Sequence, residues 1–154
     1  MKYQTKPYSC GPASVVNALR VYGKKVSERN LIKACGTIPS GPDDGTTEVG
    51  IKAGIVEYGF TYSDYEAHSQ KSAWDWMEHQ LIITKAPVIC CVNQWSHWVT
   101  VIGKAAERIV LIDPSNAMIN KKENGIQIMS KKDFLKKWNC KADKAYYGCA
   151  VLKK

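Results

Sequence analysis

The chain has 154 residues, of which 45% are hydrophobic and 23% are charged, and it carries a formal net charge of +8. This size and balance predict one globular domain over residues 1–154 and exclude a disordered chain, a fibrous repeat and a coiled coil. No apolar run is long enough for a transmembrane helix, and residues 1–7 lack the apolar stretch of a secretory signal, so we expect a cytoplasmic protein with no membrane partner.

The first half of the chain has helical spacing that is interrupted by glycine-rich turns. After Cys10, apolar residues recur at intervals of three and four, and Gly23 is placed to end that helix. Residues 37–45 contain two prolines and two glycines and are expected to form a loop. The expected helices cover residues 10–22, 28–34, 47–58 and 73–83, the last one capped by Ser72, and a short strand is expected at residues 60–65.

The second half of the chain changes to strand patterns. Residues 88–92 form an apolar run typical of a buried strand, and residues 97–103 and 108–113 are expected to pair across a tight turn. Further strands are expected at residues 126–128 and 146–152, with a short helix at 131–138 between them. Helices first and antiparallel strands second predict an α+β fold, in which the N-terminal helical half packs on a C-terminal antiparallel sheet.

The positive charge is concentrated in the last third of the chain. Residues 1–103 contain 10 basic and 9 acidic residues, whereas residues 104–154 contain 12 basic and 5 acidic residues. The lysines there come mostly as pairs, without the interleaved arginines and aromatic residues of a nucleic-acid groove. This pattern favours a solvated surface and disfavours nucleic acid as a partner, and it leaves the oligomeric state open.

Six cysteines lie at positions 10, 35, 90, 91, 140 and 149. No two of them have C-x-x-C spacing and no histidine lies at zinc-ligand spacing from them, so we expect neither a metal site nor any other cofactor. Without a secretory signal, a disulfide framework is not expected either. Cys90 and Cys91 fall within an apolar run, and one or both of them are expected to act as small buried hydrophobic residues.

Cys10 is the cysteine with an informative neighbourhood. It stands where a helix should begin, followed by Gly11 and by a proline that suits the first helical turn. The unpaired N–H groups and the positive end of the helix dipole at such a position both stabilise a thiolate, which is the nucleophilic form of cysteine. A catalytic nucleophile and a simple capping residue are both compatible with this position.

A thiolate nucleophile needs an imidazole partner, and His97 is the best placed of the three histidines. It opens a strand, and the turn to the next strand brings Asp113 close to it. If the turn is centred on Ala105, His97 lies opposite Asp113, and with a two-residue turn it lies opposite Pro114. A carboxylate there can accept a hydrogen bond from Nδ1 of His97 and orient the ring, as the third member of a catalytic triad does.

Four other positions are candidates for binding the substrate or the developing oxyanion. Gln4 precedes Cys10 by six residues, so that its side-chain amide could lie beside the sulfur, with the backbone N–H of Cys10 as a second donor. Gly11 leaves space for a substrate backbone beside the sulfur. Trp95 and Trp98 flank His97, where a large aromatic ring can exclude water, although ordinary packing would explain them as well.

These residues carry a resemblance to a known family. Gln4 followed six residues later by Cys-Gly-Pro-Ala-Ser is similar to the nucleophile motif of papain-fold cysteine peptidases, and more narrowly of the peptidase C39 family. That family is the bacteriocin-processing type that cleaves after double glycine. The resemblance extends to Gly-Thr-Thr at 45–47, His-Trp-Val at 97–99, Asp-Pro at 113–114 and the helix at 134–138. The best-known members often have an acidic residue before the cysteine and are joined to an ABC transporter, whereas this chain has Ser9 there and no ATPase motif.

The resemblance implies a papain-like fold and a peptidase that acts on a peptide or protein. By it, Cys10 is the nucleophile, His97 the general base and acid, Asp113 the orienting group and Gln4 the oxyanion donor. Cleavage after Gly-Gly or Gly-Ala in a leader peptide is implied as well. Two other functions stay open from the sequence: an acyltransferase or amidase that uses the same triad on a small substrate, and a non-catalytic module that binds peptide or nucleic acid.

Overall fold

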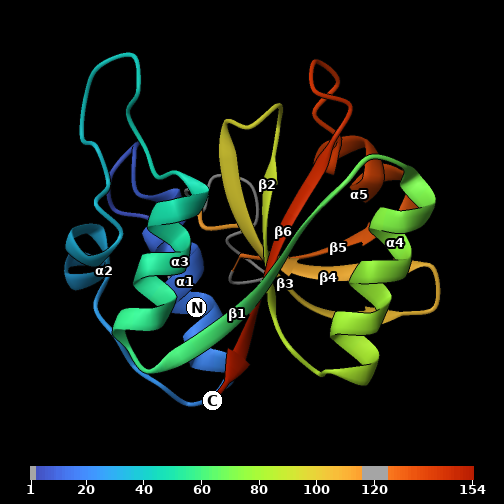
Figure 1. The fold of residues 1–154 in the computed structure, drawn as a ribbon, viewed down its shortest axis with the longest axis horizontal. Coiled ribbons are helices and arrows are strands. Elements are labelled where there is room, and N and C mark those ends of the chain that lie inside the picture. Colours follow the sequence, from blue (N-terminus) through green and yellow to red (C-terminus); the bar gives the residue numbers. More distant parts are fainter. Residues whose placement is uncertain (1–2, 116–124) are drawn as a thin grey trace.

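The protein was analysed as a computed structural model, which describes residues 3–115 and 125–154. Its centre is a six-stranded sheet in the order β1-β6-β2-β3-β4-β5, in which every neighbouring pair is antiparallel (Figure 1). The strands are β1 (Phe60–Ala67), β2 (Val88–Val92), β3 (His97–Ala105), β4 (Arg108–Ile112), β5 (Ile126–Ser130) and β6 (Tyr146–Lys153). The helices are α1 (Cys10–Val21), α2 (Glu28–Ala34), α3 (Glu48–Glu57), α4 (Gln70–Glu78), the π-helical turn η1 (His79–Ile83) and α5 (Lys131–Trp138).

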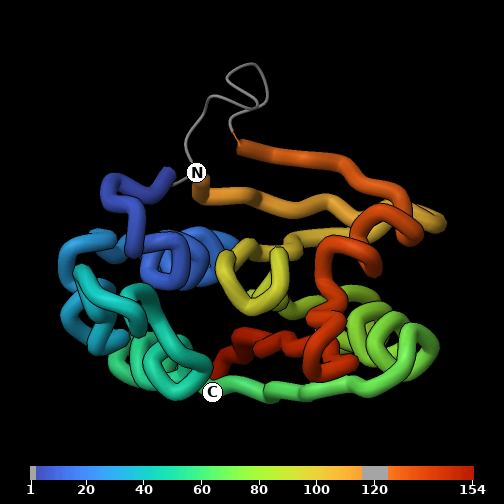
Figure 2. The backbone as a smooth tube through the Cα atoms, turned by 90° about the horizontal axis from the view of Figure 1, so that it is seen from above, coloured from blue at the N-terminus to red at the C-terminus, as the bar shows by residue number. Residues whose placement is uncertain are grey.

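Helices cover both faces of this sheet. Because side chains alternate along a strand, β2 sends Val88, Cys90 and Val92 into a core shared with α4 and α5. It sends Ile89 and Cys91 into a second core shared with α1, α2 and α3. Figures 1 and 2 show the two groups of helices on opposite sides of the strands. The predicted α+β class with an antiparallel sheet is confirmed, and the expected burial is confirmed for Cys90 and for Cys91.

Most helix starts follow the capping rule by which a hydroxyl accepts a free backbone N–H. Ser27, Thr47 and Ser130 cap α2, α3 and α5 in this way. The prediction for the fourth helix was wrong, because Ser69 is the cap and accepts a hydrogen bond from the backbone of Ser72, so that α4 begins at Gln70. Within the described ranges, no helix combines the length and the apolar character needed to cross a membrane.

The predicted register between β3 and β4 was also wrong. Thr100 pairs with Ile112, whereas the prediction paired it with Val110 or Leu111. The turn between the strands consists only of Ala106 and Glu107, and the register shifts again at a bulge between Val101 and Gly103. The ladder therefore ends before His97, which has no backbone partner on β4 and reaches Asp113 only through its side chain.

Candidate active site

Cys10 is the first residue of α1, as its sequence neighbourhood predicted. Ser9, at the N-cap position, makes no side-chain hydrogen bond to the helix, because its hydroxyl is bonded to the backbone of Lys6 instead. The side chain of Ser9 therefore does not neutralise the N-terminal end of α1, where the helix dipole is positive and Cys10 is the first residue. The helix is held against the sheet by Thr100 on β3, which donates to the carbonyl of Ser14 over 2.7 Å.

His97 and Asp113 form a short hydrogen bond at the ends of β3 and β4. The distance between Nε2 of His97 and Oδ1 of Asp113 is 2.7 Å, and only 13% and 8% of the two side chains are exposed. Ser115 donates to the same oxygen from its backbone N–H over 2.9 Å and from its hydroxyl over 2.7 Å. The predicted proximity of His97 and Asp113 is confirmed, but the expectation that Nδ1 makes the bond was wrong.

The binding of Nε2 to Asp113 leaves Nδ1 as the ring nitrogen for another partner. Cys10 lies within interaction range of the ring, as both a hydrogen-bond partner and a charge. Burial alone would lower the pKa of His97, but the contacts with Asp113 and Cys10 outweigh it and raise the pKa to about 9. Burial would raise the pKa of Asp113, yet the hydrogen bonds from His97 and Ser115 lower it to about 2. The imidazole is therefore protonated and the carboxylate ionised at neutral pH.

The turn that leads into His97 has an unusual backbone. Asn93, Gln94 and Trp95 are consecutive and all have positive φ, at 54°, 59° and 65°, a conformation that costs free energy for residues other than glycine. Hydrogen bonds to the segment after α5 hold this turn in place. Gln94 donates to the carbonyl of Asn139 over 2.9 Å and accepts from the N–H of Lys141 over 2.8 Å. The start of β3 is therefore anchored from outside its own sheet.

The segment before α1 is fixed at two points beside the triad candidates. The N–H of Gln4 donates to the carbonyl of Pro114 over 2.8 Å. The buried carboxylate of Glu28 accepts from both the backbone N–H and the hydroxyl of Thr5. The side-chain nitrogen of Gln4 donates to the carbonyls of Lys6 and Pro7, over 2.9 and 3.4 Å, while its oxygen is buried without a hydrogen-bond partner. The amide of Gln4 thus has to rotate before it can donate to a substrate, and its oxyanion role stays a prediction.

Gly11 faces protein on the side where a side chain would stand. A Cβ atom there would lie 2.7 Å from Thr46 and 3.2 Å from Ile51. Glycine is therefore needed at this position because α1 packs closely against the start of α3. Its predicted contact with the substrate is not tested by this geometry.

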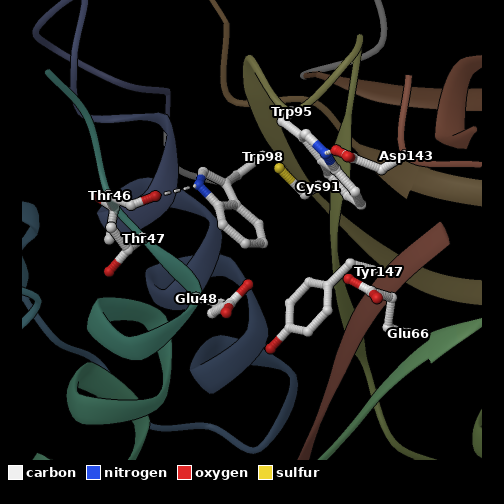
Figure 3. A pocket seen from close by; sticks show the side chains of 9 residues that line it. All are labelled: Thr46, Thr47, Glu48, Glu66, Cys91, Trp95, Trp98, Asp143 and Tyr147. Atoms are coloured by element: carbon white, nitrogen blue, oxygen red, sulfur yellow. Dashed lines mark hydrogen bonds between the residues drawn. The ribbon is translucent and has the colours of Figure 1, made fainter. Parts of the chain in front are cut away.

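A pocket of about 410 Å³ opens beside these residues (Figure 3). Trp98, whose indole nitrogen donates to the carbonyl of Thr46 over 2.9 Å, forms one wall, and Cys91 and Trp95 lie behind it. Cys91, which lines the pocket, interacts electrostatically with Cys10, so the pocket is near the thiol. It is lined by Thr46, Thr47, Glu48, Glu66, Cys91, Trp95, Trp98, Asp143 and Tyr147.

All six cysteines are buried, Cys10 included, and four of the others have a raised pKa. Burial raises the pKa of Cys35, Cys91 and Cys149 to about 12, and it raises the pKa of the fully buried Cys90 well above its usual value. Thiols with such pKa values are protonated at neutral pH and react slowly. Among residues 3–115 and 125–154, no group of three or more histidine, cysteine, aspartate or glutamate side chains could hold a metal ion.

Comparison with known proteins now decides the family. The sequence profile described as the Peptidase C39 family matches residues 1–142. The chain belongs to the peptidase C39 family. No curated protein matches it with significant sequence similarity.

Several solved C39 domains have the same fold. The peptidase domain of Streptococcus ComA, a bifunctional ABC transporter, is 18% identical with a TM-score of 0.73, over 99% of this chain and 97% of that one. A double glycine motif protease from an AMS/PCAT transporter, in complex with the leader peptide, is 18% identical with a TM-score of 0.68, over 99% of this chain and 89% of that one. The N-terminal peptidase C39 like domain of a toxin secretion ATP-binding protein from Vibrio parahaemolyticus is 13% identical with a TM-score of 0.63, over 98% of this chain and 99% of that one. At these identities the likeness shows a shared papain-like fold.

Sequence reasoning missed most of the pocket. Trp95 and Trp98 were predicted, and Thr46 and Thr47 appeared only as part of a family motif. Glu48, Glu66, Asp143 and Tyr147 were not singled out, because they come from three segments far apart in the sequence that the sheet order brings together. The signal for Ser115 was available in its position two residues after Asp113, where a hydroxyl commonly bonds an aspartate.

Proposed function

We propose that this C39 family member is a cysteine peptidase that hydrolyses peptide bonds, with Cys10 as nucleophile, His97 as general base and acid, and Asp113 as the orienting group. The observation that carries the proposal is the position of His97, which lies between a carboxylate at 2.7 Å and the thiol at the start of α1. A ring held through Nε2 presents Nδ1 to the sulfur, so that the proton of Cys10 has a single acceptor.

The reaction follows from these positions. The thiolate of Cys10 attacks the carbonyl carbon of the scissile bond, and the carbonyl oxygen gains negative charge beside the first-turn N–H groups of α1. Protonated His97 gives its proton to the leaving amine, which breaks the C–N bond and leaves an acyl group on the sulfur. His97 then removes a proton from water, the resulting hydroxide attacks the acyl carbon, and the free carboxylate leaves as the thiolate returns.

Gln4 is proposed as a side-chain donor to the oxyanion. Its backbone is bonded to Pro114, next to Asp113, and this supports a place at the site. Donation requires one amide hydrogen to leave the carbonyl of Lys6 or Pro7 when substrate binds. Loss of one oxyanion donor typically lowers kcat by roughly 10²–10³-fold, and we expect the same of Gln4→Ala.

For the substrate we propose a peptide with small residues, Gly-Gly or Gly-Ala, before the scissile bond. The support is indirect. The chain belongs to the C39 family, and one fold relative is a double glycine motif protease in complex with a leader peptide.

Two measurements test this function. The first incubates the protein with a peptide library derived from a proteome and identifies the residues before each cut by mass spectrometry, with Cys10→Ala as the control. Small residues at the last two positions are expected, and unchanged turnover by Cys10→Ala would end the proposal. The new C-terminus also matters, since a free carboxylate indicates hydrolysis, whereas an amine-bearing product indicates acyl transfer.

The second measurement needs no substrate. Brief exposure to iodoacetamide at neutral pH should alkylate Cys10 ahead of Cys35, Cys90, Cys91 and Cys149, whose pKa values are raised by burial. His97→Ala should slow the labelling of Cys10 and leave the others unchanged. Equal labelling of Cys10 and the four buried thiols would argue for a non-catalytic binding module.

A further inference from the structure

The pocket beside the thiol has a wall of aromatic rings and an unbalanced negative charge. Trp95, Trp98 and Tyr147 form its apolar surface, and Glu48, Glu66 and Asp143 place three carboxylates around it. None of the nine residues that line it is basic. This is the opposite of the chain as a whole, which has 22 basic and 14 acidic residues.

The three carboxylates come from different elements, all of which border this pocket. Glu48 is in the first turn of α3, and in Figure 3 its carboxylate extends toward the ring of Tyr147 on β6. Glu66 lies on β1, and Asp143 lies in the segment between α5 and β6. Burial is the main cause of the raised pKa of Tyr147 and of Cys91, and the charge of Glu48 adds a smaller contribution to both, so Glu48 acts on two sides of the pocket.

These carboxylates are only partly accounted for by structural roles. Asp143 accepts a hydrogen bond from the indole of Trp95, which orients the ring but leaves the negative charge in place. Glu66 makes a 3.4 Å contact with His68, and both side chains are more than half exposed. Glu48 is exposed and lies at the positive end of the α3 dipole. Lys52, one turn further along α3, forms its ion pair with Asp64 at 3.0 Å and not with Glu48.

A second depression next to the pocket is also lined by aromatic and acidic residues. This depression, of about 340 Å³, shares Glu48, Glu66 and Tyr147 with the pocket, and it adds Tyr65 and Asp64. A side chain that enters from the thiol therefore meets aromatic faces first and carboxylates around them. Aromatic faces together with carboxylates are the surroundings that a cationic group prefers, because the ring quadrupole and the negative charge act in the same direction.

We propose that this pocket is a specificity site that takes a lysine or arginine side chain of the peptide substrate, a few residues from the scissile bond. The apolar stem packs on Trp98 and Tyr147, and the charged head lies among Glu48, Glu66 and Asp143. The volume of about 410 Å³ has room for one such side chain and part of its neighbour. This inference names a specificity site of the proposed peptidase, so it rests on the proposed function.

The test uses acetylated and amidated octapeptides in which one position at a time is fixed as lysine, arginine, norleucine or glutamate. Norleucine has the length of lysine without its charge, so it separates the electrostatic from the apolar contribution. At one position, wild type should cleave the lysine and arginine peptides with a kcat/KM at least about tenfold above glutamate and severalfold above norleucine. The preference should shrink as salt rises, since exposed charges are screened.

Variants assign the preference to the pocket. Glu48→Gln and Glu66→Gln should each reduce the lysine-to-norleucine ratio, because kcat/KM for the lysine peptide falls further than kcat/KM for the norleucine peptide. Glu57→Gln is the matched control, because it removes one exposed carboxylate from the other end of α3. A ratio that stays the same in both pocket variants, or one that falls equally in Glu57→Gln, would overturn the inference.

Binding to Cys10→Ala separates this inference from the proposed function. The lysine peptide should bind Cys10→Ala more tightly than the glutamate peptide does, and Glu48→Gln should remove the difference. If wild type cleaves none of the peptides but this binding pattern appears, the specificity site stands and the peptidase proposal fails. If cleavage occurs with no preference at any position, the peptidase stands and the cationic site is refuted.

Discussion

Replacement of Asp113 by asparagine should lower the pKa of His97 by more than one pH unit. The rise of the His97 pKa from 6.5 to about 9 corresponds to roughly 3 kcal/mol, at about 1.36 kcal/mol per unit. Burial works against this rise, so the contacts with Asp113 and Cys10 together contribute more than that amount. Asp113 supplies both a 2.7 Å hydrogen bond and a full charge, and we assign at least half of the total to it.

The assay is an NMR titration of the His97 ring protons in wild type and in Asp113→Asn. Ser115→Ala is the matched control, because it removes one donor to Asp113 and keeps the carboxylate charge. Its effect on the His97 pKa should be small. A change below about half a pH unit in Asp113→Asn would refute the assignment and leave Cys10 as the main cause.

The same pair makes stability depend on pH with a definite sign. Because the pKa of His97 is higher in the folded chain, its stabilisation is complete below about pH 6.5 and disappears as the pH rises through about 9. The lowered pKa of Asp113 contributes above about pH 3.8 and is lost as the pH falls toward 2. Urea unfolding at pH 6 and pH 10 should show a larger loss for wild type than for Asp113→Asn, and parallel losses would contradict this linkage.

Three further substitutions test the packing that holds the site. Glu28→Gln removes one carboxylate acceptor from Thr5 and should lower the free energy of unfolding in urea by about 1–3 kcal/mol. Activity should fall as well, because the segment that carries Gln4 loosens. Unchanged stability and unchanged activity would contradict the anchor role of Glu28. Gly50→Ala would place a Cβ against the carbonyl oxygen of Cys35 and should lower the free energy of unfolding by about 1–3 kcal/mol. Gly103→Ala, whose Cβ would lie 4.0 Å from its nearest neighbour, should lower it less. Trp138→Phe loses a buried 2.7 Å hydrogen bond and should lower the free energy of unfolding by about 1–3 kcal/mol; no change would show that the bond contributes nothing net.

Local signals in the sequence were sufficient for most elements. The start of α1 at Cys10 followed from glycine and proline near a helical apolar pattern, and the buried strand at 88–92 followed from its apolar run. The proximity of His97 and Asp113 followed from the antiparallel pairing of consecutive strands, because residues at the open end of a hairpin stay near one another even when the register is off. That tolerance is why the contact was correct although the pairing of Thr100 was not.

Other features depend on tertiary context that no local pattern contains. The nitrogen of His97 that bonds Asp113 depends on the direction of the ring, which the anchored turn at 93–95 sets. The acidic pocket needs β6 beside both β1 and β2, an order in which the last strand enters the middle of the sheet. The carbonyl partners of the Gln4 amide arise from a tight local turn whose sequence gives no clear signal.

The path of β6 determines where the protein can be attached to something else. Tyr147 lines the pocket, and Lys153 lies six residues further along the same strand, roughly 20 Å away at about 3.3 Å per residue. Gln4, in contrast, is bonded to the residue next to Asp113. A purification tag, fluorophore or immobilising linker joined after Lys153 should leave the entrance for peptides open, whereas a bulky fusion close to residue 4 would crowd it.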